Sequence, residues 1–392
     1  MKEILLREDD MRTPRRKNER GIALPVALFS LVVIGVLVTG TFFAGRLEQQ
    51  SGQNTFFASQ AAEAAEAGIS DAIGTTTPGD LLSLTTGGAA ANLGSVSLGT
   101  RVDASRQLSR LTSSVFLIRS EGSRRNAAGT ALATRSAGSL VRLVTPRLVM
   151  KGGLTAVGRI NVTGNATVSG NDTTPPGWLS APGVECPAEA DKPGVVYNGT
   201  LVQTGSSSIT GSPPTLADAT LDPTTLLGGT TFDQLKALRT LTLTSNINGI
   251  GPALTNSVPP KCNTGVQTNW GAPTDPASPC FNYFPIIYHY GDLSLSGSGS
   301  GQGILLVEGT LSVQGRVSFF GPVIATGAVN VRGTGTDDVK FYGGIIASDV
   351  QLDDSRLSGN ATVLYSSCAN RRALQGSGVV TRLSERGWVQ LY

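Results

Sequence analysis

"RRKNERGIALPVALFSLVVIGVLVTGTFFAGR" runs from Arg15 to Arg46 and determines the first part of the fold. Its basic beginning is followed by Gly21 and then by 23 residues without a charge, Ile22 to Ala44. As a helix this segment is about 34 Å long, which is enough to cross the hydrocarbon core of a bilayer. The positive charges before it predict that the residues preceding the helix stay on the cytoplasmic side.

A secretory signal peptide is one alternative for this segment. The apolar part of such a signal is only about 7–15 residues long and is followed by small residues at the cleavage site. Here the apolar run is longer, and "GRLE" follows it at residues 45–48. Two alternatives stay open: a membrane anchor that remains intact, and a segment that functions after cleavage between Gly21 and Ile22.

The helix is predicted to continue beyond the membrane. The stretch "RLEQQSGQNTFFASQAAEAAEAGISDAI" (46–73) is rich in Ala, Glu and Gln, which favour helices. One continuous helix is therefore expected from Ile22 to about Ile73, weakened by Gly52 and Gly68 and ended by the residues before Pro78. Apolar residues recur at every fourth position and predict a face that packs on the rest of the protein. These residues are Phe57, Ala61, Ala65, Ile69 and Ile73, with Glu63 and Glu66 on the polar side.

This N-terminal region, about residues 15–73, resembles that of PilX-type minor pilins and related type IV pilin-like, or pseudopilin-like, proteins. The similar features are the basic leader ending in Gly21, the apolar run, Glu48, Asn54 and the run from Gln60 to Ala65. The resemblance implies that prepilin peptidase removes residues 1–21 by cutting at the processing site, Gly21–Ile22. It also implies methylation of the new amine on Ile22.

The resemblance further implies a location and a set of partners. The chain is expected to cross the inner membrane once before assembly, and to lie in the periplasm, at the cell surface or in a filament afterwards. Other pilin subunits and the pilus or secretion assembly machinery are the implied partners. One position departs from the pattern of major pilins, which carry Glu at the fifth mature residue, because Val26 stands there. That departure argues against a major filament subunit.

The rest of the chain is expected to be mainly β. Charged residues make up 15% and aromatic residues 6%, and the 49 glycines indicate short strands joined by tight turns. Three strand-like stretches, at 95–109, 113–123 and 128–145, predict an antiparallel meander packed on the helix. Gly122 and Gly129 are expected to bracket one of its turns.

The C-terminal region contains a repeat that predicts a β-solenoid. Gly291, Gly309, Gly327 and Asp349 occupy equivalent positions 18, 18 and 22 residues apart. Repeats of this length bury their faces by stacking on their neighbours. A β-sandwich is the alternative, because strands bounded by glycine also suit it. Residues 171–284 are predicted to be a loop-rich insertion laid over the solenoid, with one short helix at 231–241.

The predicted fold class is therefore α+β, mainly β. The long N-terminal helix is expected to pack on an antiparallel β meander, followed by a β-solenoid region with a loop-rich insertion. The predicted divisions are a leader at 1–21, a transmembrane and stem helix at 22–74, a pilin-like meander at 75–145 and a solenoid-like domain at 146–392.

The four cysteines show no CxxC spacing typical of zinc or redox sites. In a chain that crosses a membrane, an even number favours disulfides in an oxidising compartment, with buried free thiols as the alternative. Cys262 and Cys280 enclose 17 residues of low intrinsic order and are predicted to pair. Cys186 and Cys368 are then left to each other.

No set of residues predicts catalysis, a cofactor or a metal site. His289 is the single histidine and is expected to be structural. Two acidic pairs, Asp337 with Asp338 and Asp353 with Asp354, are expected to be solvated turn residues, since neighbouring side chains on a strand point to opposite faces. The net charge of +3 is too small to indicate nucleic acid binding.

These features are compatible with three functions. The first is a non-enzymatic minor pilin or pilin-like subunit of a type IV pilus or type II secretion-like filament, contributing to filament assembly and surface adhesion. The second is a permanently anchored β-solenoid adhesin or wall-binding module. The third, a membrane-tethered enzyme acting on glycans, has no catalytic residues that the sequence can name.

Overall fold

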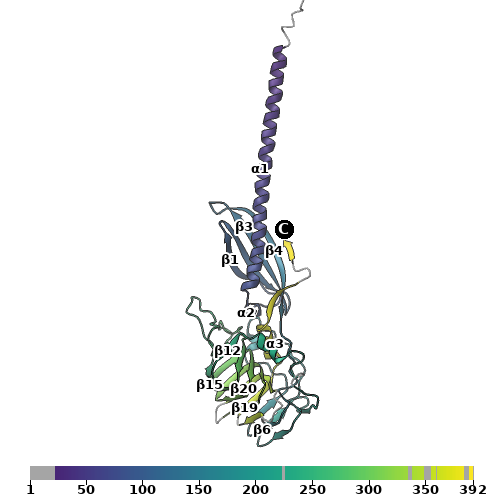
Figure 1. The fold of residues 1–392 in the computed structure, drawn as a ribbon, viewed down its shortest axis with the longest axis vertical. Coiled ribbons are helices and arrows are strands. Elements are labelled where there is room, and N and C mark those ends of the chain that lie inside the picture. The colour runs from purple at the N-terminus through teal and green to yellow at the C-terminus, as the bar shows by residue number, and fades with distance from the viewer. Residues whose placement is uncertain are drawn as a thin grey trace, which may run out of the picture.

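The computed structural model describes residues 23–222, 226–333, 338–347, 355–358, 360–383 and 388–391. A long helical stem leads to an antiparallel sheet packed on its lower half, and a larger β body lies beyond that sheet (Figure 1). The long N-terminal helix and the mainly β structure that follows it confirm the predicted fold class, α+β and mainly β.

The stem is a single helix, α1 (Ala23–Thr75), of 53 residues, about 80 Å long at 1.5 Å per residue. The prediction of one continuous helix is confirmed. The chain then turns at Thr77, which caps the short helix α2 (Pro78–Leu82). The Thr77 backbone N–H donates to the Asp80 carboxylate at 2.8 Å, and the Asp80 N–H donates to the Thr77 hydroxyl at 3.3 Å. This reciprocal capping, with proline at the first helical position, fixes the start of α2.

The lower half of α1 buries the predicted face. Ala61, Ala65 and Ile69 are fully buried, whereas Phe57 and Ile73 at its two ends are half-buried. At the lower end Ile73 still packs against the hydrophobic core that Ala65 and Ile69 form with the sheet. Glu63 and Glu66 are exposed, as predicted.

Four antiparallel strands form most of the sheet on α1. They are β1 (Ala91–Gly99), β2 (Val102–Arg110), β3 (Val115–Arg125) and β4 (Ala131–Val144), and they pair in that order. The first predicted stretch is thus a hairpin of two strands, since the chain reverses at Arg101, which has a positive φ of 63°. Gly122 lies inside β3, so the expectation that it brackets a turn is wrong. Gly129, with φ of 84°, is in the turn.

Two glycines allow α1 and the sheet to approach closely. A Cβ added to Gly122 would lie 2.9 Å from the Cβ of Ala64 and closer still to the backbone of α1. A Cβ added to Gly68 would lie 2.7 Å from the Cβ of Ala104 on β2. Gly68 was expected only to weaken the helix, but the structure gives it a packing role. Gly52 has open space around it.

The C-terminal segment returns to the same sheet. Strands β23 (Val379–Arg382) and β24 (Trp388–Leu391) both pair antiparallel with β4, and in the described part of the chain the sheet has six strands. The predicted solenoid-like domain, 146–392, therefore ends in two strands that belong to the sheet of the head. Long-range strand pairing of this kind leaves no local pattern. Below, "head" means this sheet with the lower half of α1, and "body" means residues 145–378.

The body strands pair in parallel and form one sheet of 18 strands in the described residues. The repeat strands are β14 (Ile286–Tyr290), β16 (Ile304–Glu308), β18 (Arg316–Ala325) and β20 (Val339–Ala347). Their pairing has the predicted register, because Ile287 lies opposite Leu305, Leu305 opposite Val323, and Val323 opposite Ile345. The antiparallel pairing of a β-sandwich is not found among the described body strands. Asp349 lies outside the described residues.

Further strands alternate with these repeat strands along the chain or extend the sheet at its ends. These are β15 (Leu293–Gln302), which is as long as β18, and the shorter β17 (Leu311–Gln314), β19 (Val329–Arg332), β21 (Ser355–Ser358) and β22 (Ala361–Tyr365), then β5 (Leu154–Ala156), β6 (Ile160–Val162), β7 (Thr167–Ser169), β8 (Val195–Tyr197), β9 (Leu201–Gln203), β10 (Ser208–Thr210) and β11 (Thr215–Ala217), and finally β12 (Leu241–Leu243) and β13 (Ile247–Ile250).

The stacking order differs from the sequence order. β5, the first strand of the body in sequence, pairs with β20, the last of the repeat strands. Strands β8 to β11 then extend the sheet beyond β5 to β7. β12 and β13 stack on β14 and β15 at the opposite end. Residues 171–284 therefore supply strands at both ends of the sheet, which corrects the prediction that they are an insertion laid over it. The predicted short helix is present as α3 (Phe232–Ala237), and it ends before β12.

The body has an inner and an outer hydrophobic core. Side chains such as Leu305, Phe319 and Ile345 belong to one large cluster of buried residues on one face of the sheet. On the outer face, Leu306 and Ile324 are covered by helix α4 (Ser367–Gly376) and by Trp178 of the short 3-10 helix η1 (Trp178–Ser180). Helix α4 was not predicted from the sequence.

Candidate membrane anchor and assembly surface

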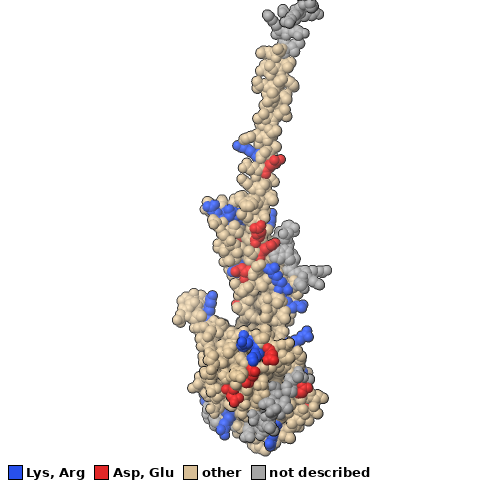
Figure 2. Space-filling view, viewed as in Figure 1, with Lys and Arg blue, Asp and Glu red and all other residues tan. Residues whose placement is uncertain are grey.

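The upper part of α1 is an exposed apolar cylinder. Its large side chains have no cover in the structure: Leu24 is 73% exposed and Phe29 is 71% exposed. Among the described residues, this is the one helix long and apolar enough to cross a membrane. In Figure 2 the upper stem shows no charged side chain until a basic and an acidic side chain appear close to each other. In the sequence the first such residues after the apolar run are Arg46 and Glu48.

Two threonines within this cylinder form hydrogen bonds to the backbone of the helix itself. The Thr39 hydroxyl donates to the carbonyl of Gly35 at 2.7 Å, and the Thr41 hydroxyl donates to that of Leu37 at 3.1 Å. Because hydrocarbon offers no hydrogen-bond partner, internal bonds of this kind make threonine compatible with a membrane helix.

The residues that carried the N-terminal resemblance divide into two groups. Glu48 and Asn54 are exposed on the open part of the stem, whereas Ala61 and Ala65 are buried in the head. Val26 is an exposed apolar residue of the cylinder. The predicted processing site, Gly21–Ile22, lies outside the described residues.

A shallow hollow of about 520 Å³ lies where the stem leaves the sheet. Six of its lining residues are on α1, and the seventh is Arg135 on β4. The helix residues are spaced by three or four, so they continue the buried face upward, past the end of the sheet. We call this hollow the seam. Its residues are Leu47, Gln50, Ser51, Asn54, Thr55, Ala58 and Arg135.

Polar contacts fix α1 on the sheet below the seam. Asp71 on α1 forms an ion pair with Arg106 on β2. Arg382 on β23 donates to the Ser70 hydroxyl of α1 at 2.9 Å. The C-terminal strand is thus bound both to β4 and to the stem.

The head meets the body around a buried arginine at the end of β2. Arg110 is 2% exposed and donates to the carbonyls of Leu84 in the head segment at 2.9 Å and Gly183 in the body at 3.3 Å. It also pairs with the Glu185 carboxylate at 3.4 Å. Burial lowers the pKa of Arg110, and the nearby Glu185 charge opposes that shift. One side chain therefore joins segments from both parts.

Helix α4 is held on the body by a second buried arginine. Arg372 is 2% exposed, and its guanidinium carbon lies 5.1–5.2 Å from the ring centroids of Trp178, Phe281 and Phe284. It donates to the Asn282 side chain at 2.7 Å. Burial, and to a smaller extent the charge of Arg110, lowers the pKa of Arg372 to about 10, so it remains a cation at neutral pH. Aromatic faces stabilise such a cation.

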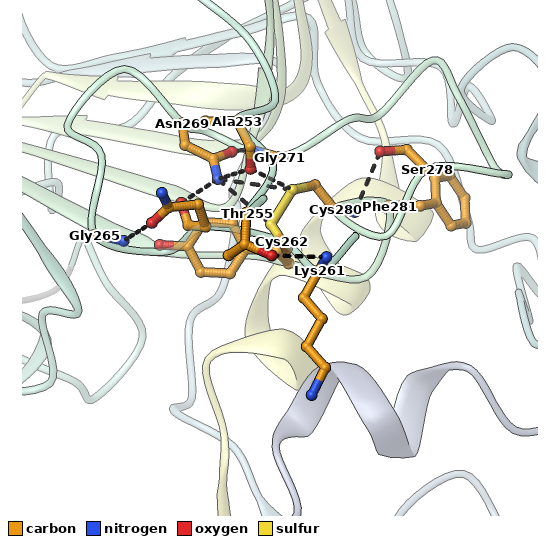
Figure 3. The surroundings of a disulfide bond; sticks show 12 residues. Ala253, Thr255, Lys261, Cys262, Gly265, Asn269, Gly271, Ser278, Cys280 and Phe281 are labelled. Atoms are coloured by element: carbon orange, nitrogen blue, oxygen red, sulfur yellow. Dashed lines mark hydrogen bonds between the residues drawn. A yellow bond between two sulfur atoms is a disulfide. The ribbon is translucent and has the colours of Figure 1, made fainter. Parts of the chain in front are cut away.

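Both predicted cysteine pairs lie at disulfide distance, with 4.9 Å between the Cα atoms in each. Cys186 with Cys368 ties the segment carrying Glu185 to α4. Cys262 with Cys280 closes a loop at the β13 end of the sheet (Figure 3). Asn269 lies inside this loop and donates to the carbonyls of Asn263 at 2.6 Å and Ala253 at 3.2 Å.

The other residues considered for chemistry have structural surroundings. His289 is 7% exposed, and its ring nitrogens lie 3.2 Å from the carbonyl oxygens of Leu243 and Asp292. Asp338 pairs with Lys340 at 3.3 Å. Asp337, Asp353 and Asp354 lie outside the described residues. Within the described residues, no three His, Cys, Asp or Glu side chains are grouped for metal binding.

The burial of Arg110 and Arg372 and the packing roles of Gly68 and Gly122 were not predicted from the sequence. The local sequence around Arg110 and Arg372 gives no sign of burial, because partners such as Glu185 and Asn282 come from distant segments. The glycines carried a possible signal: each lies in a regular helix or strand, where glycine often marks a close backbone approach.

No protein-family model and no curated protein matches the sequence. Among solved structures, the crystal structure of the competence-associated pilin ComZ from Thermus thermophilus is similar, with a TM-score of 0.22 and 11% sequence identity. The alignment covers 86% of this chain and 97% of that chain. A TM-score this low supports no conclusion about fold or function.

Proposed function

We propose that the chain is a minor, pilin-like subunit of a type IV pilus or type II secretion-like filament. In this proposal α1 crosses the inner membrane once and holds head and body on the outer side. Prepilin peptidase then cuts after Gly21, and the assembly machinery moves the subunit into a filament. The PilX-type resemblance of residues 15–73 supports the assignment to this class.

The continuity of α1 is the observation that carries the proposal. One helix supplies both the exposed apolar cylinder and the buried face at Ala61, Ala65 and Ile69. An anchor that only tethers a domain needs no fixed geometry, and a flexible linker serves that purpose. A rigid rod instead sets the distance and direction between the apolar segment and the head. That arrangement suits subunits whose stems pack side by side while their heads contact one another.

The role proposed for the body is surface binding without catalysis. Its parallel strands and repeat register support a β-solenoid, in which successive coils stack on one another. The body lies at the far end of the molecule from the apolar cylinder (Figure 1). In a filament or at its tip, it would therefore be the part presented to the surroundings.

Shearing of surface filaments tests this proposal. In cells making the full chain, the protein should be recovered with the sheared filaments. A Gly21→Glu variant should stay in the membrane fraction, because a bulky anion replaces the small residue that the peptidase accepts. Recovery of both forms only from the membrane would favour the permanently anchored adhesin or wall-binding module.

A further inference from the structure

The two ends of the body sheet differ in how they are covered. β12 and β13 form one end, where the loop between Cys262 and Cys280 packs on them. Trp270 of this loop is fully buried in the same hydrophobic cluster as the two strands. Gln267 of the loop accepts a hydrogen bond from the Thr244 N–H at 3.1 Å. The apolar side chains of these strands are therefore at most 6% exposed, namely Leu241, Leu243, Ile247 and Ile250.

β9, β10 and β11 form the other end. Each has a registered partner strand on one side: β9 pairs with β6, β10 with β7 and β11 with β8. Leu201 and Ile209 are only half-buried, and all of β11 is exposed, Leu216 to 40%. Figure 1 shows β6, which β9 pairs with, at the side of the body farthest from the stem. Within the described residues, this end has no cover comparable to that of β12 and β13.

Backbone groups at this end point outward. The Ser208 N–H donates to the Ala166 carbonyl at 2.9 Å, and the Thr210 carbonyl accepts from the Gly170 N–H at 2.8 Å. Ser208 and Thr210 thus face β7, and Ile209 between them faces away, because successive residues of a strand direct their backbone groups to opposite sides. By the same alternation the outward residues of the three strands are Leu201, Gln203, Ile209, Thr215 and Ala217. In the described part of the chain, no strand pairs with them on the open side.

These strands lack the residues that keep natural sheet edges apart. Charged side chains and proline within an edge strand oppose pairing with another chain. Residues 193–217 contain no charged residue, and none of the three strands contains proline. Each strand is only three residues long, so one added strand would form few hydrogen bonds. A stable contact therefore needs a partner that pairs with all three strands at once.

We propose that this end of the body binds the same end of a second copy of the chain. The contact is isologous, and its two-fold axis makes the facing strands antiparallel. The outward N–H and C=O groups of residues such as Ile209 pair across the contact, and the half-buried Leu201 and Ile209 side chains become buried. The proposal is independent of the membrane crossing and of filament assembly.

Two features favour a second copy over a strand of another protein. A second copy presents three edge strands of matching length, whereas one extended peptide pairs with a single strand. Because residues 193–217 carry no charge, no like-charge repulsion opposes contact between two identical ends. The β12–β13 end does not offer the same contact, because the loop with Trp270 packs on it.

Sedimentation equilibrium of the full chain in detergent tests the proposal. The wild type should dimerise reversibly. Leu216→Lys should raise the dimer dissociation constant by more than about tenfold, because it places like charges from both copies at the contact. Hydrogen exchange in residues 199–217 should slow as the protein concentration rises, whereas exchange in β18 should not change.

Leu238→Lys is the matched control, because Leu238 is also 40% exposed and lies at the end of α3, outside the proposed contact. It should dimerise as the wild type does. A wild type that stays monomeric would overturn the proposal. So would a dimer that Leu216→Lys leaves intact, which would assign the association to another surface such as the stem. Equal weakening by both lysine variants would also overturn it.

Discussion

Val379 lies directly opposite Val144 in the antiparallel pairing of β23 with β4. The whole body lies between these two residues in the sequence, yet it leaves and re-enters the head at neighbouring positions of one sheet. The body is therefore inserted between two adjacent strands, and the head does not depend on it for the order of its own strands.

Replacement of residues 145–378 by the two-residue link Asn-Gly should leave a folded head. The link joins two paired strand ends in the geometry that such a turn favours. The melting temperature should fall, because Arg110 loses its contacts with Gly183 and Glu185. Circular dichroism during heating should still show a cooperative transition. A non-cooperative melt would mean that the head needs the body in order to fold.

Two glycines of α1 should respond in opposite ways to the same substitution. Gly68→Ala places a methyl group against Ala104 and Ser120 and should destabilise the protein by about 1–3 kcal/mol, as overpacking does. Gly52→Ala meets open space and should be neutral or stabilising by up to about 1 kcal/mol, since alanine favours helix. Thermal melts of the two full-length variants in detergent decide this. Similar effects from both would contradict the close contact at Gly68.

The buried face of the stem predicts a contrast between neighbouring positions. Ala65→Asp would bury an unpaired charge in a fully buried site and should cost more than about 2 kcal/mol. Glu63→Ala, at an exposed position, should change the melting temperature little. If Ala65→Asp melts like the parent while Glu63→Ala does not, the helix packs through another face.

Peptide mapping under non-reducing conditions should find two linked peptide pairs, Cys186 with Cys368 and Cys262 with Cys280. In the chain-entropy model, the separation of 182 residues corresponds to a stabilisation of about 5 kcal/mol, and the separation of 18 to about 3 kcal/mol. Cys186→Ser should therefore lower the melting temperature of the body more than Cys262→Ser. Four free thiols in the folded protein would contradict both pairs.

The sequence predicted those parts of the fold that follow a regular period. The four-residue spacing from Phe57 to Ile73 gave the buried face, and the spacing of Gly291, Gly309 and Gly327 gave the register of the stacked strands. Both patterns repeat because each element buries one face, so the period records the burial directly.

The return of β23 to β4 and the stacking of β5 on β20 could not be predicted in this way. Both depend on pairing between distant segments, and no spacing in the chain records it. The parts of the candidate site differ in the same way in whether the sequence could predict them. The apolar cylinder and the processing site at Gly21–Ile22 are local sequence features, whereas the seam exists only because folding places Arg135 beside Asn54.

The mass of the N-terminal peptide is the most direct test of the central claim, which is that this chain is processed as a pilin-like subunit. Membrane-extracted protein from cells containing prepilin peptidase should begin at Ile22, with or without one added methyl group. Gly21→Glu should retain the leader. An intact Met1 start in the unaltered protein from such cells would contradict the account and leave α1 as an uncleaved anchor.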